Sequence, residues 1–291
     1  MKPPRFEYYD PRSLEEALAL LNTYQSDSKV LAGGQSLVPL LNMRLARPKV
    51  VVDINRIEAL NYVRAANGSI AVGANARQRA LQTESLIAER VGILRDAAKY
   101  IAHPQIRNRG TICGSIAHAD PAAELPALAL ALEADMILTS AKATRTVPAD
   151  GFFQSFFTTA LAANEILTEV RFPPSAKETA WSILEVSRRH GDFAVVGIVA
   201  ALTLDQDRQL ITKSRLVYFG VGPTPMRIED AEKALLGQAS GEAAFAAAGD
   251  IAGRGIDPSN DIHATAEYRR AVAATLTRRA LGAVAQKLRA S

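Results

Sequence analysis

The sequence predicts an α+β protein in which two lobes of strands and helices precede a C-terminal domain. Three observations support this fold class. Short β-branched and apolar runs alternate with amphipathic helical patterns in the first half of the chain. Pro173 and Pro174, followed by small and polar residues, mark a change in composition. Beyond them, three long extended runs come before three helical patterns, an order typical of α+β domains.

The first lobe, about residues 1–55, begins as an α/β unit. Ser13 and Glu16 have the spacing of a helix capping box. The runs 30–32 and 50–54 are almost entirely β-branched or apolar, which predicts strands that are covered on both faces.

The stretch KVLAGGQSL, from Lys29 to Leu37, contains the first of these runs and then two adjacent glycines. Gly33 and Gly34 can adopt positive φ without a Cβ clash, so successive backbone N–H groups can turn toward one anion. Ser36 adds a hydroxyl where a helical pattern begins. The stretch predicts a phosphate cradle, although an ordinary change of chain direction would leave the same pattern.

The second lobe, about residues 56–175, opens with a hairpin predicted at Asn67 and Gly68. Apolar residues at helical spacing predict one helix over 86–101, which Pro104 stops. A group of phenylalanines later in the lobe is expected to pack in the core rather than to form a ligand platform. The group consists of Phe152, Phe153, Phe156 and Phe157.

A second loop, QIRNRGTICGSIAHAD, runs from Gln105 to Asp120 without a periodic pattern. Its glycines and hydroxyl residues are Gly110, Thr111, Gly114 and Ser115. Loops of this length inside compact domains tend to be functional. Two such loops suggest two jaws around a long, phosphate-bearing ligand such as a dinucleotide. Neither matches G-x-G-x-x-G after a strand or G-x-x-x-x-G-K-[ST], which disfavours a Rossmann fingerprint and a P-loop.

After the two prolines the chain predicts a three-stranded antiparallel meander followed by three helices. The extended runs are 181–187, 194–204 and 210–221. The helical patterns are 229–236, 242–251 and 265–288. The segment RRHGDFA, between the first two runs, is by itself a basic hairpin turn.

Composition excludes several classes of protein. The single cysteine allows no internal disulfide and no cysteine-based iron-sulfur or zinc site in this chain. The four histidines lack metal-site spacing, and the net charge of +4 is scattered, without a nucleic-acid-binding motif. The absence of a run of about 18 apolar residues predicts no membrane span and a cytoplasmic location. No nucleophile stands with a base in a known motif, so the chemistry must come from a cofactor.

Two motifs together, AGGQSL at 32–37 and IRNRGTICGSIAHADPAAELP at 106–126, resemble the FAD-binding medium subunit of the molybdenum hydroxylases. The resemblance covers essentially the whole chain. It extends to FEYYDPRSLEEALALL at 6–21, RRHGDFA at 188–194 and EYRRAVAATLTRRAL at 267–281.

The resemblance implies a two-lobed, PCMH-type FAD-binding domain over 1–175 and a flavoprotein C-terminal domain over 176–291. It implies an oxidoreductase subunit that binds FAD and passes electrons from partner iron-sulfur clusters to an external acceptor. The partners would be a small iron-sulfur subunit and a large molybdenum subunit, and only these would carry the clusters and the molybdenum cofactor. Substrate hydroxylation would occur on the large subunit.

The resemblance further implies the cofactor-binding residues, with no catalytic residue and no metal ligand in this chain. They are Lys29, Ala32, Gly33, Gly34, Gln35, Ser36, Leu37, Ala102, Thr111, Ile112, Cys113, Gly114, Ser115, Asp120, Leu161 and Phe193. Asp120 precedes Pro121 and is also predicted to cap a helix. Cys113 stands where the family usually has glycine. If this position needs positive φ, a cysteine there would destabilise the loop by about 1–2 kcal/mol. We expect the loop to bind flavin nonetheless, with an inert thiol.

Three other classes stay open at this point. A self-sufficient FAD-dependent oxidase would need a base or a covalent flavin attachment site. A cell-wall reductase of related fold would use NADPH and would have a substrate domain after the flavin domain. The predicted meander and C-terminal helix argue against this class. A non-enzymatic assembly subunit would hold no flavin. The sequence identifies neither the substrate nor the electron acceptor.

Overall fold

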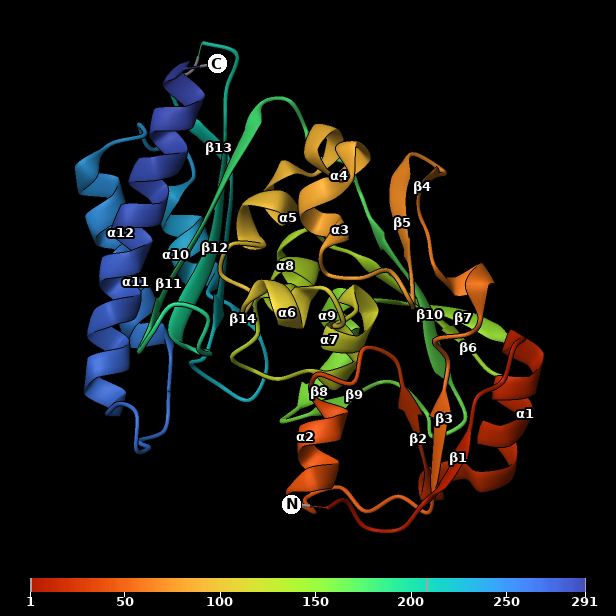
Figure 1. Cartoon of the computed structure of the whole chain (residues 1–291). Helices are drawn as coiled ribbons and strands as arrows, with labels where there is room; N and C mark the ends of the chain where they lie inside the picture. The colour runs from red at the N-terminus through yellow and green to blue at the C-terminus, as the bar shows by residue number, and fades with distance from the viewer. Residues whose placement is uncertain (1, 208, 291) are drawn as a thin grey trace. The chain divides into compact units, whose positions relative to one another are not determined.

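A computed structural model of the chain describes residues 2–207 and 209–290 (Figure 1). The backbone forms two compact units, and neither is continuous in sequence. Unit 1 consists of Met1–Arg90, His103–Ala119 and Glu133–Pro173. Unit 2 consists of Val91–Ala102, Asp120–Leu132 and Pro174–Ser291. The domain limits 1–175 and 176–291, which are continuous segments, stay a prediction.

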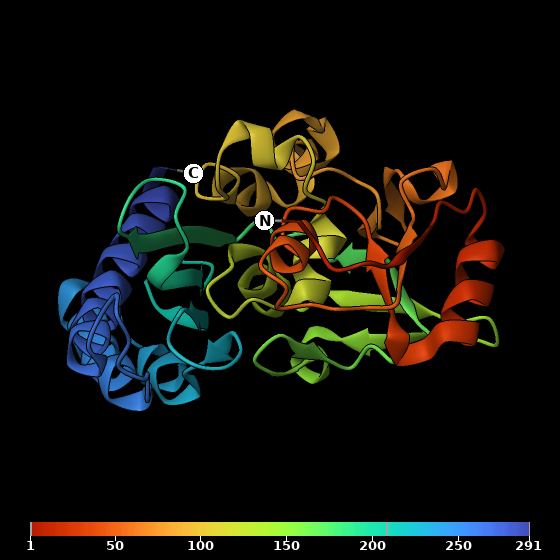
Figure 2. The same cartoon turned by 60° about the horizontal axis from the view of Figure 1, so that its bottom comes forward.

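The first lobe of unit 1 contains a parallel sheet in the order β1-β3-β2. Its elements are β1 (Glu7–Tyr9), α1 (Leu14–Tyr24), the 3-10 turn η1 (Gln25–Asp27), β2 (Ser28–Leu31), α2 (Leu37–Asn42) and β3 (Val50–Asp53). The predicted Ser13 cap is confirmed, because the Ser13 hydroxyl accepts from Glu16 N–H, whereas the Glu16 carboxylate accepts from the N–H of Arg12 rather than from that of Ser13. Helix α1 packs against β3; both lie in the red and orange part of Figure 2.

The second lobe of unit 1 contains an antiparallel sheet in the order β4-β5-β10-β6-β7. The strands are β4 (Val63–Ala66), β5 (Ser69–Gly73), β6 (Asp135–Thr139), β7 (Thr144–Pro148) and β10 (Ile166–Phe172). The other elements are η2 (Glu58–Leu60), α3 (Ala80–Thr83), α4 (Ser85–Arg90), α6 (Pro104–Arg107), α7 (Ile112–His118), α9 (Ala149–Phe152), β8 (Phe153–Ser155) and β9 (Thr158–Thr159). The hairpin predicted at Asn67 and Gly68 is confirmed, with φ of 49° and 82°.

Three predictions for the middle of the chain are wrong. The helix expected over 86–101 breaks at Val91, whose φ of −141° and ψ of 59° are not helical, and α5 (Gly92–Ala97) begins at a glycine, a poor helix former. The stretch expected to be irregular contains α6 and α7, which are too short to produce a visible period. Of the four phenylalanines, Phe152 is buried, but Phe156 and Phe157 are each 56% exposed.

Unit 2 is built on a sheet in the order β11-β12-β13-β14. The strands are β11 (Thr179–Ser187), β12 (Ala194–Leu204), β13 (Ile211–Phe219) and β14 (Met226–Arg227). The predicted three-stranded meander is confirmed, and the two-residue β14 extends it. Helices α10 (Glu229–Leu235), α11 (Glu242–Gly255) and α12 (Ala266–Ala290) cover one face of this sheet (Figure 1).

Side chains of β12 alternate between two apolar layers of unit 2. Ile198, Ala200 and Leu202 belong to the buried cluster shared with α10, α11 and α12. Strands β12 and β13 also contact α8 (Glu124–Ala131), and all eight residues of α8 are buried. The sheet is therefore covered on both faces within unit 2. Among residues 2–207 and 209–290, no helix is long and apolar enough to cross a membrane.

Candidate functional site

The two glycine loops predicted from the sequence meet in unit 1. A Cβ atom on Gly33 would lie 2.4 Å from the Arg109 carbonyl oxygen, 2.6 Å from Gly110 Cα and 2.9 Å from Thr111 N. These are backbone atoms, which cannot give way as a flexible side chain would. Glycine at position 33 therefore allows the first loop to lie directly on the second.

The first loop exposes consecutive backbone donors. The N–H groups of Gly33, Gly34, Gln35 and Ser36 donate no hydrogen bond within the described part of the chain. Gly34 has φ of 75°, a left-handed conformation that turns neighbouring N–H groups toward a common side. The four residues are only partly buried, so a ligand can reach them. This arrangement fits an anionic group such as a diphosphate.

Two side chains that sequence reasoning missed hold the loops together. Asn55 donates from Nδ2 to the Ala32 carbonyl at 2.7 Å. Arg77 donates to Asn55 Oδ1 at 2.7 Å and to the Arg109 carbonyl at 2.7 Å, so it links the first loop to the second. Burial, with a smaller contribution from the Arg109 charge, lowers the pKa of Arg77. No sequence motif marks this pair, because the two residues are 22 positions apart.

The second loop is shaped by a helix start. Thr111 is the N-cap of α7, and its Oγ1 accepts from Gly114 N–H at 3.0 Å. A Cβ on Gly114 would lie 2.5 Å from that same oxygen, so the cap leaves no room for a side chain at position 114. Ser115 N–H donates to the Thr111 carbonyl at 3.2 Å. The cap thus fixes both hydroxyl residues of the loop.

Cys113 does not need the conformation that glycine favours. It lies in the first turn of α7, outside the residues with positive φ, so the strain considered for this position does not arise. Its side chain is buried, and its thiol lies 3.4 Å from the Val72 carbonyl. Burial raises the pKa of this thiol, which disfavours the reactive thiolate. That Cys113 is chemically inert stays a prediction.

The remaining predicted residues of unit 1 lie in or beside these loops in the sequence, except Leu161, which follows β9. Lys29 is exposed on β2, Ile112 is buried at the start of α7, and Leu161 N–H donates to Thr159 Oγ1 at 3.3 Å. The Ala32 carbonyl accepts the hydrogen bond from Asn55 Nδ2, and Leu37 is the first residue of α2.

Three predicted site residues belong to unit 2. Asp120 does not cap a helix, contrary to the prediction. Helix α8 begins four residues later with Ala123 at its N-cap, and Asp120 Oδ1 instead accepts from Ala122 N–H in a local turn. Ala102 has φ of 40°. Phe193 is 64% exposed, two residues after Gly191, whose φ is 87°.

Known families account for nearly the whole chain. The family described as "FAD binding domain in molybdopterin dehydrogenase" matches residues 4–175. The chain belongs to this family. The "CO dehydrogenase flavoprotein C-terminal domain" matches residues 181–284 of the same chain.

Members of the family share both sequence and structure with the chain. The 6-hydroxypseudooxynicotine dehydrogenase complex subunit alpha of Paenarthrobacter nicotinovorans is 41% identical, over 99% of the chain and 97% of the relative. The carbon monoxide dehydrogenase medium chain of Hydrogenophaga pseudoflava is 40% identical, over 97% of the chain and 98% of the relative. A structure of that carbon monoxide dehydrogenase superimposes with a TM-score of 0.94 over 98% of both chains, at 41% identity. The structure of quinoline 2-oxidoreductase from Pseudomonas putida 86 also superimposes with a TM-score of 0.94 over 99% of both chains, at 34% identity.

Family membership confirms the predicted fold class, the flavoprotein assignment, FAD as the cofactor and the oxidoreductase class. The geometry of the two loops is compatible with this cofactor, since the first loop has free backbone donors and the second holds two hydroxyl residues in place. Among the described residues, no group of three or more His, Cys, Asp or Glu side chains is arranged to hold a metal ion.

Proposed function

We propose that this chain is the FAD-carrying, electron-transferring subunit of a multi-subunit molybdenum hydroxylase. The observation that carries the proposal is the contact between the two loops. Gly33 lies against Gly110 and Thr111, and the four N–H groups from position 33 to 36 have no acceptor within the described residues. A cradle of backbone donors is suited to binding a diphosphate rather than to acid–base or nucleophilic chemistry.

Each part of the cradle has its own task. The N–H groups of the first loop bind the FAD diphosphate, and Asn55 and Arg77 keep that loop against the second. Thr111 Oγ1 accepts one hydrogen bond from the backbone, which leaves its hydroxyl hydrogen available for the cofactor. The other FAD contacts proposed from the resemblance are Lys29, Ala32, Leu37, Ala102, Ile112, Cys113, Gly114, Ser115, Asp120, Leu161 and Phe193. When bound, FAD supplies a ring that accepts and releases one or two electrons.

The proposed assembly contains a small iron-sulfur subunit and a large molybdenum subunit. One cysteine cannot ligate an iron-sulfur cluster alone, so the clusters belong to a partner. The relatives' names support this division, since one is a subunit of a dehydrogenase complex and another is a medium chain. The electrons leave to an external acceptor, and the assembly works in the cytoplasm, as the composition suggests.

An affinity-tagged copy of the chain, expressed in the organism that encodes it, tests the assembly. We expect two further polypeptides to co-purify, together with iron, acid-labile sulfide and molybdenum. Substrate should reduce the flavin of this complex but not the flavin of the isolated chain. Substrate turnover by the isolated, FAD-loaded chain with oxygen as acceptor would contradict the proposal and indicate a self-sufficient oxidase.

A further inference from the structure

Helices α11 and α12 of unit 2 border a cavity of about 350 Å³ at the first turn of α11. Phe245 and Ala285, both buried, supply its apolar floor. Three arginines that are exposed to solvent, Arg278, Arg279 and Arg289, also line it. No residue of the two loops in unit 1 contributes to it, so the cavity is separate from the cradle described above.

The charge at this cavity is unbalanced. Three arginines and one glutamate line it, which leaves two positive charges in excess. Within the described residues, Arg278 and Arg279 form no ion pair or hydrogen bond, and Arg289 donates only to the Ser240 carbonyl, at 3.3 Å. Gly241, the N-cap of α11, offers no side chain to the N–H groups of the first turn. Positive charge and helix N–H groups thus line the same cavity.

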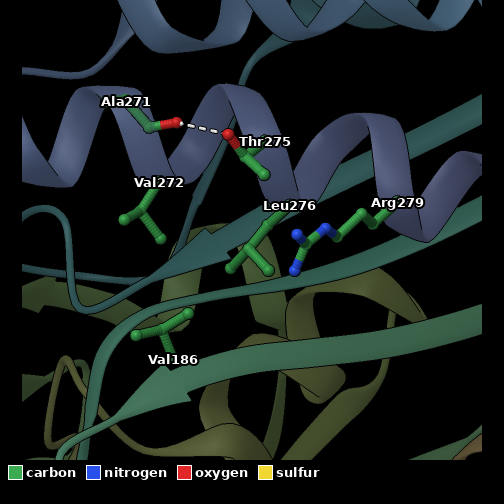
Figure 3. Close-up of a pocket in the computed structure, with 6 residues that line it drawn as sticks. All are labelled: Val186, Ala271, Val272, Thr275, Leu276 and Arg279. Atoms are coloured by element: carbon green, nitrogen blue, oxygen red, sulfur yellow. Dashed lines mark hydrogen bonds between the residues drawn. The ribbon is translucent and has the colours of Figure 1, made fainter.

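Arg279 also lines a smaller cavity of about 230 Å³ between α12 and β11. Figure 3 shows its guanidinium turned toward Leu276, over a surface that Val186 and Val272 make apolar. Thr275 Oγ1 donates to the Ala271 carbonyl at 3.0 Å. Arg279 thus lines both cavities, and within the described residues its guanidinium forms no ion pair or hydrogen bond.

Gly282 keeps the larger cavity open. It lies in the interior of the 25-residue helix α12, where glycine is less stable than alanine. Close packing does not explain it, because a Cβ on Gly282 would have no atom within 4 Å. Gly249 of α11 differs, since its Cβ would lie 2.7 Å from the Ala274 carbonyl oxygen. At position 282 the missing side chain leaves free space four residues from Arg278 on the same helix face.

We propose that this cavity binds a small anion carrying two or more phosphate or carboxylate groups. Arginine binds both groups through paired N–H donors, and three arginines can engage more than one group at once. The volume lies within the range of small-molecule sites. The apolar floor of Phe245 and Ala285 accommodates the carbon skeleton of the ligand rather than its charges. The site gives the C-terminal domain an anion-binding function beyond electron transfer.

Isothermal titration calorimetry of the full-length chain, loaded with FAD, tests the proposal. Pyrophosphate and citrate are the probes for phosphate and carboxylate ligands. We expect saturable binding of at least one probe, weakened by added sodium chloride. Gly282→Leu fills the cavity without changing any charge, and Arg278→Gln removes one donor pair. Each should weaken binding by about tenfold or more, whereas Glu242→Gln should strengthen it.

Arg254→Gln is the matched control, because Arg254 is exposed on α11 but does not line the cavity. It should bind the probes as the unaltered chain does. The proposal is overturned if neither probe binds, if Gly282→Leu binds like the unaltered chain, or if Arg254→Gln weakens binding as much as Arg278→Gln. FAD content, read from visible absorption, is measured for every variant. A chain that lacks FAD but binds a probe in a Gly282-dependent way would refute the proposed function and leave this inference standing.

Discussion

A methyl group at position 33 would force the two loops of the cradle apart. In Gly33→Ala the new Cβ would meet backbone atoms of Arg109 and Gly110 at 2.4 and 2.6 Å. Relieving such overlap costs about 1–3 kcal/mol, so FAD should bind roughly ten- to a hundredfold more weakly. Fluorescence titration of the FAD-depleted chain with FAD measures this. Gly151→Ala, where the nearest atom is 3.9 Å away, is the control and should bind FAD normally.

A buried and a partly buried carboxyl group of unit 2 should make its stability depend on pH. Burial raises the pKa of Glu124 to about 7, and burial together with the Glu124 charge raises the pKa of Glu185 to about 8. Their ordinary value is 4.5, so between about pH 5 and 8 the folded state holds protons that the unfolded state has lost. The free energy of unfolding therefore falls as pH rises through this window. For each of the two protons, the free energy of unfolding changes by at most about 1.4 kcal/mol per pH unit. The change is smaller for Glu185, because water partly reaches its carboxyl group.

Thermal unfolding measured from pH 6 to pH 9 tests this loss of stability, because Glu124 and Glu185 titrate at roughly these pH values in the folded chain. The unaltered chain should lose stability across the range, and Glu185→Gln should lose less because the amide stays neutral. Glu178→Gln, at an exposed position, should behave as the unaltered chain. Equal pH profiles for Glu185→Gln and the unaltered chain would show that Glu185 is ionised in the folded state.

At the scale of single residues, the sequence predicted the glycine and hydroxyl positions of the cradle but not the residues that support it. Gly33 and Thr111 stand out because their types are needed for close approach and helix capping. Asn55 and Arg77 are ordinary polar residues whose roles depend on tertiary contacts. Such contacts leave no local pattern in the sequence.

Glycine at position 197 of β12 leaves room for the ring of Phe219, its cross-strand partner on β13. A Cβ on Gly197 would lie 2.0 Å from Cζ of Phe219, which is fully buried and cannot move aside. Gly197→Ala should destabilise unit 2 by about 1–3 kcal/mol. Phe219→Leu frees space at the same point, so the double variant should lose less stability than the sum of the single ones. Strictly additive unfolding midpoints would contradict the packing described for these strands.

At the scale of elements, predictions were accurate where a pattern repeats. Strands β11 to β13 and helices α10 to α12 are long enough for several periods, and each was expected close to its observed position. The short helices α6 and α7 were not, because four and seven residues give no visible period. The break at Val91 was missed for a different reason. The apolar spacing continues across it while the backbone turns out of the helix.

For the whole molecule, the sequence predicts the domain limits 1–175 and 176–291, and unit 2 of the structure also contains Val91–Ala102 and Asp120–Leu132. Helices α5 and α8 lie in the N-terminal half of the chain but belong to unit 2, where α8 covers one face of the β12–β13 sheet. Composition changes mark linkers such as the one at Pro173 and Pro174, but they do not reveal where a preceding helix packs. The family resemblance carried the functional prediction, since composition alone reached only a cofactor-dependent protein.

The visible absorption spectrum of the purified chain, recorded before and after heat release of its chromophore, shows whether the two loops form an FAD site. We expect the bands of an oxidised flavin, released as FAD in an amount equal to that of the chain. A well-folded chain that is colourless and takes up no added FAD would contradict it.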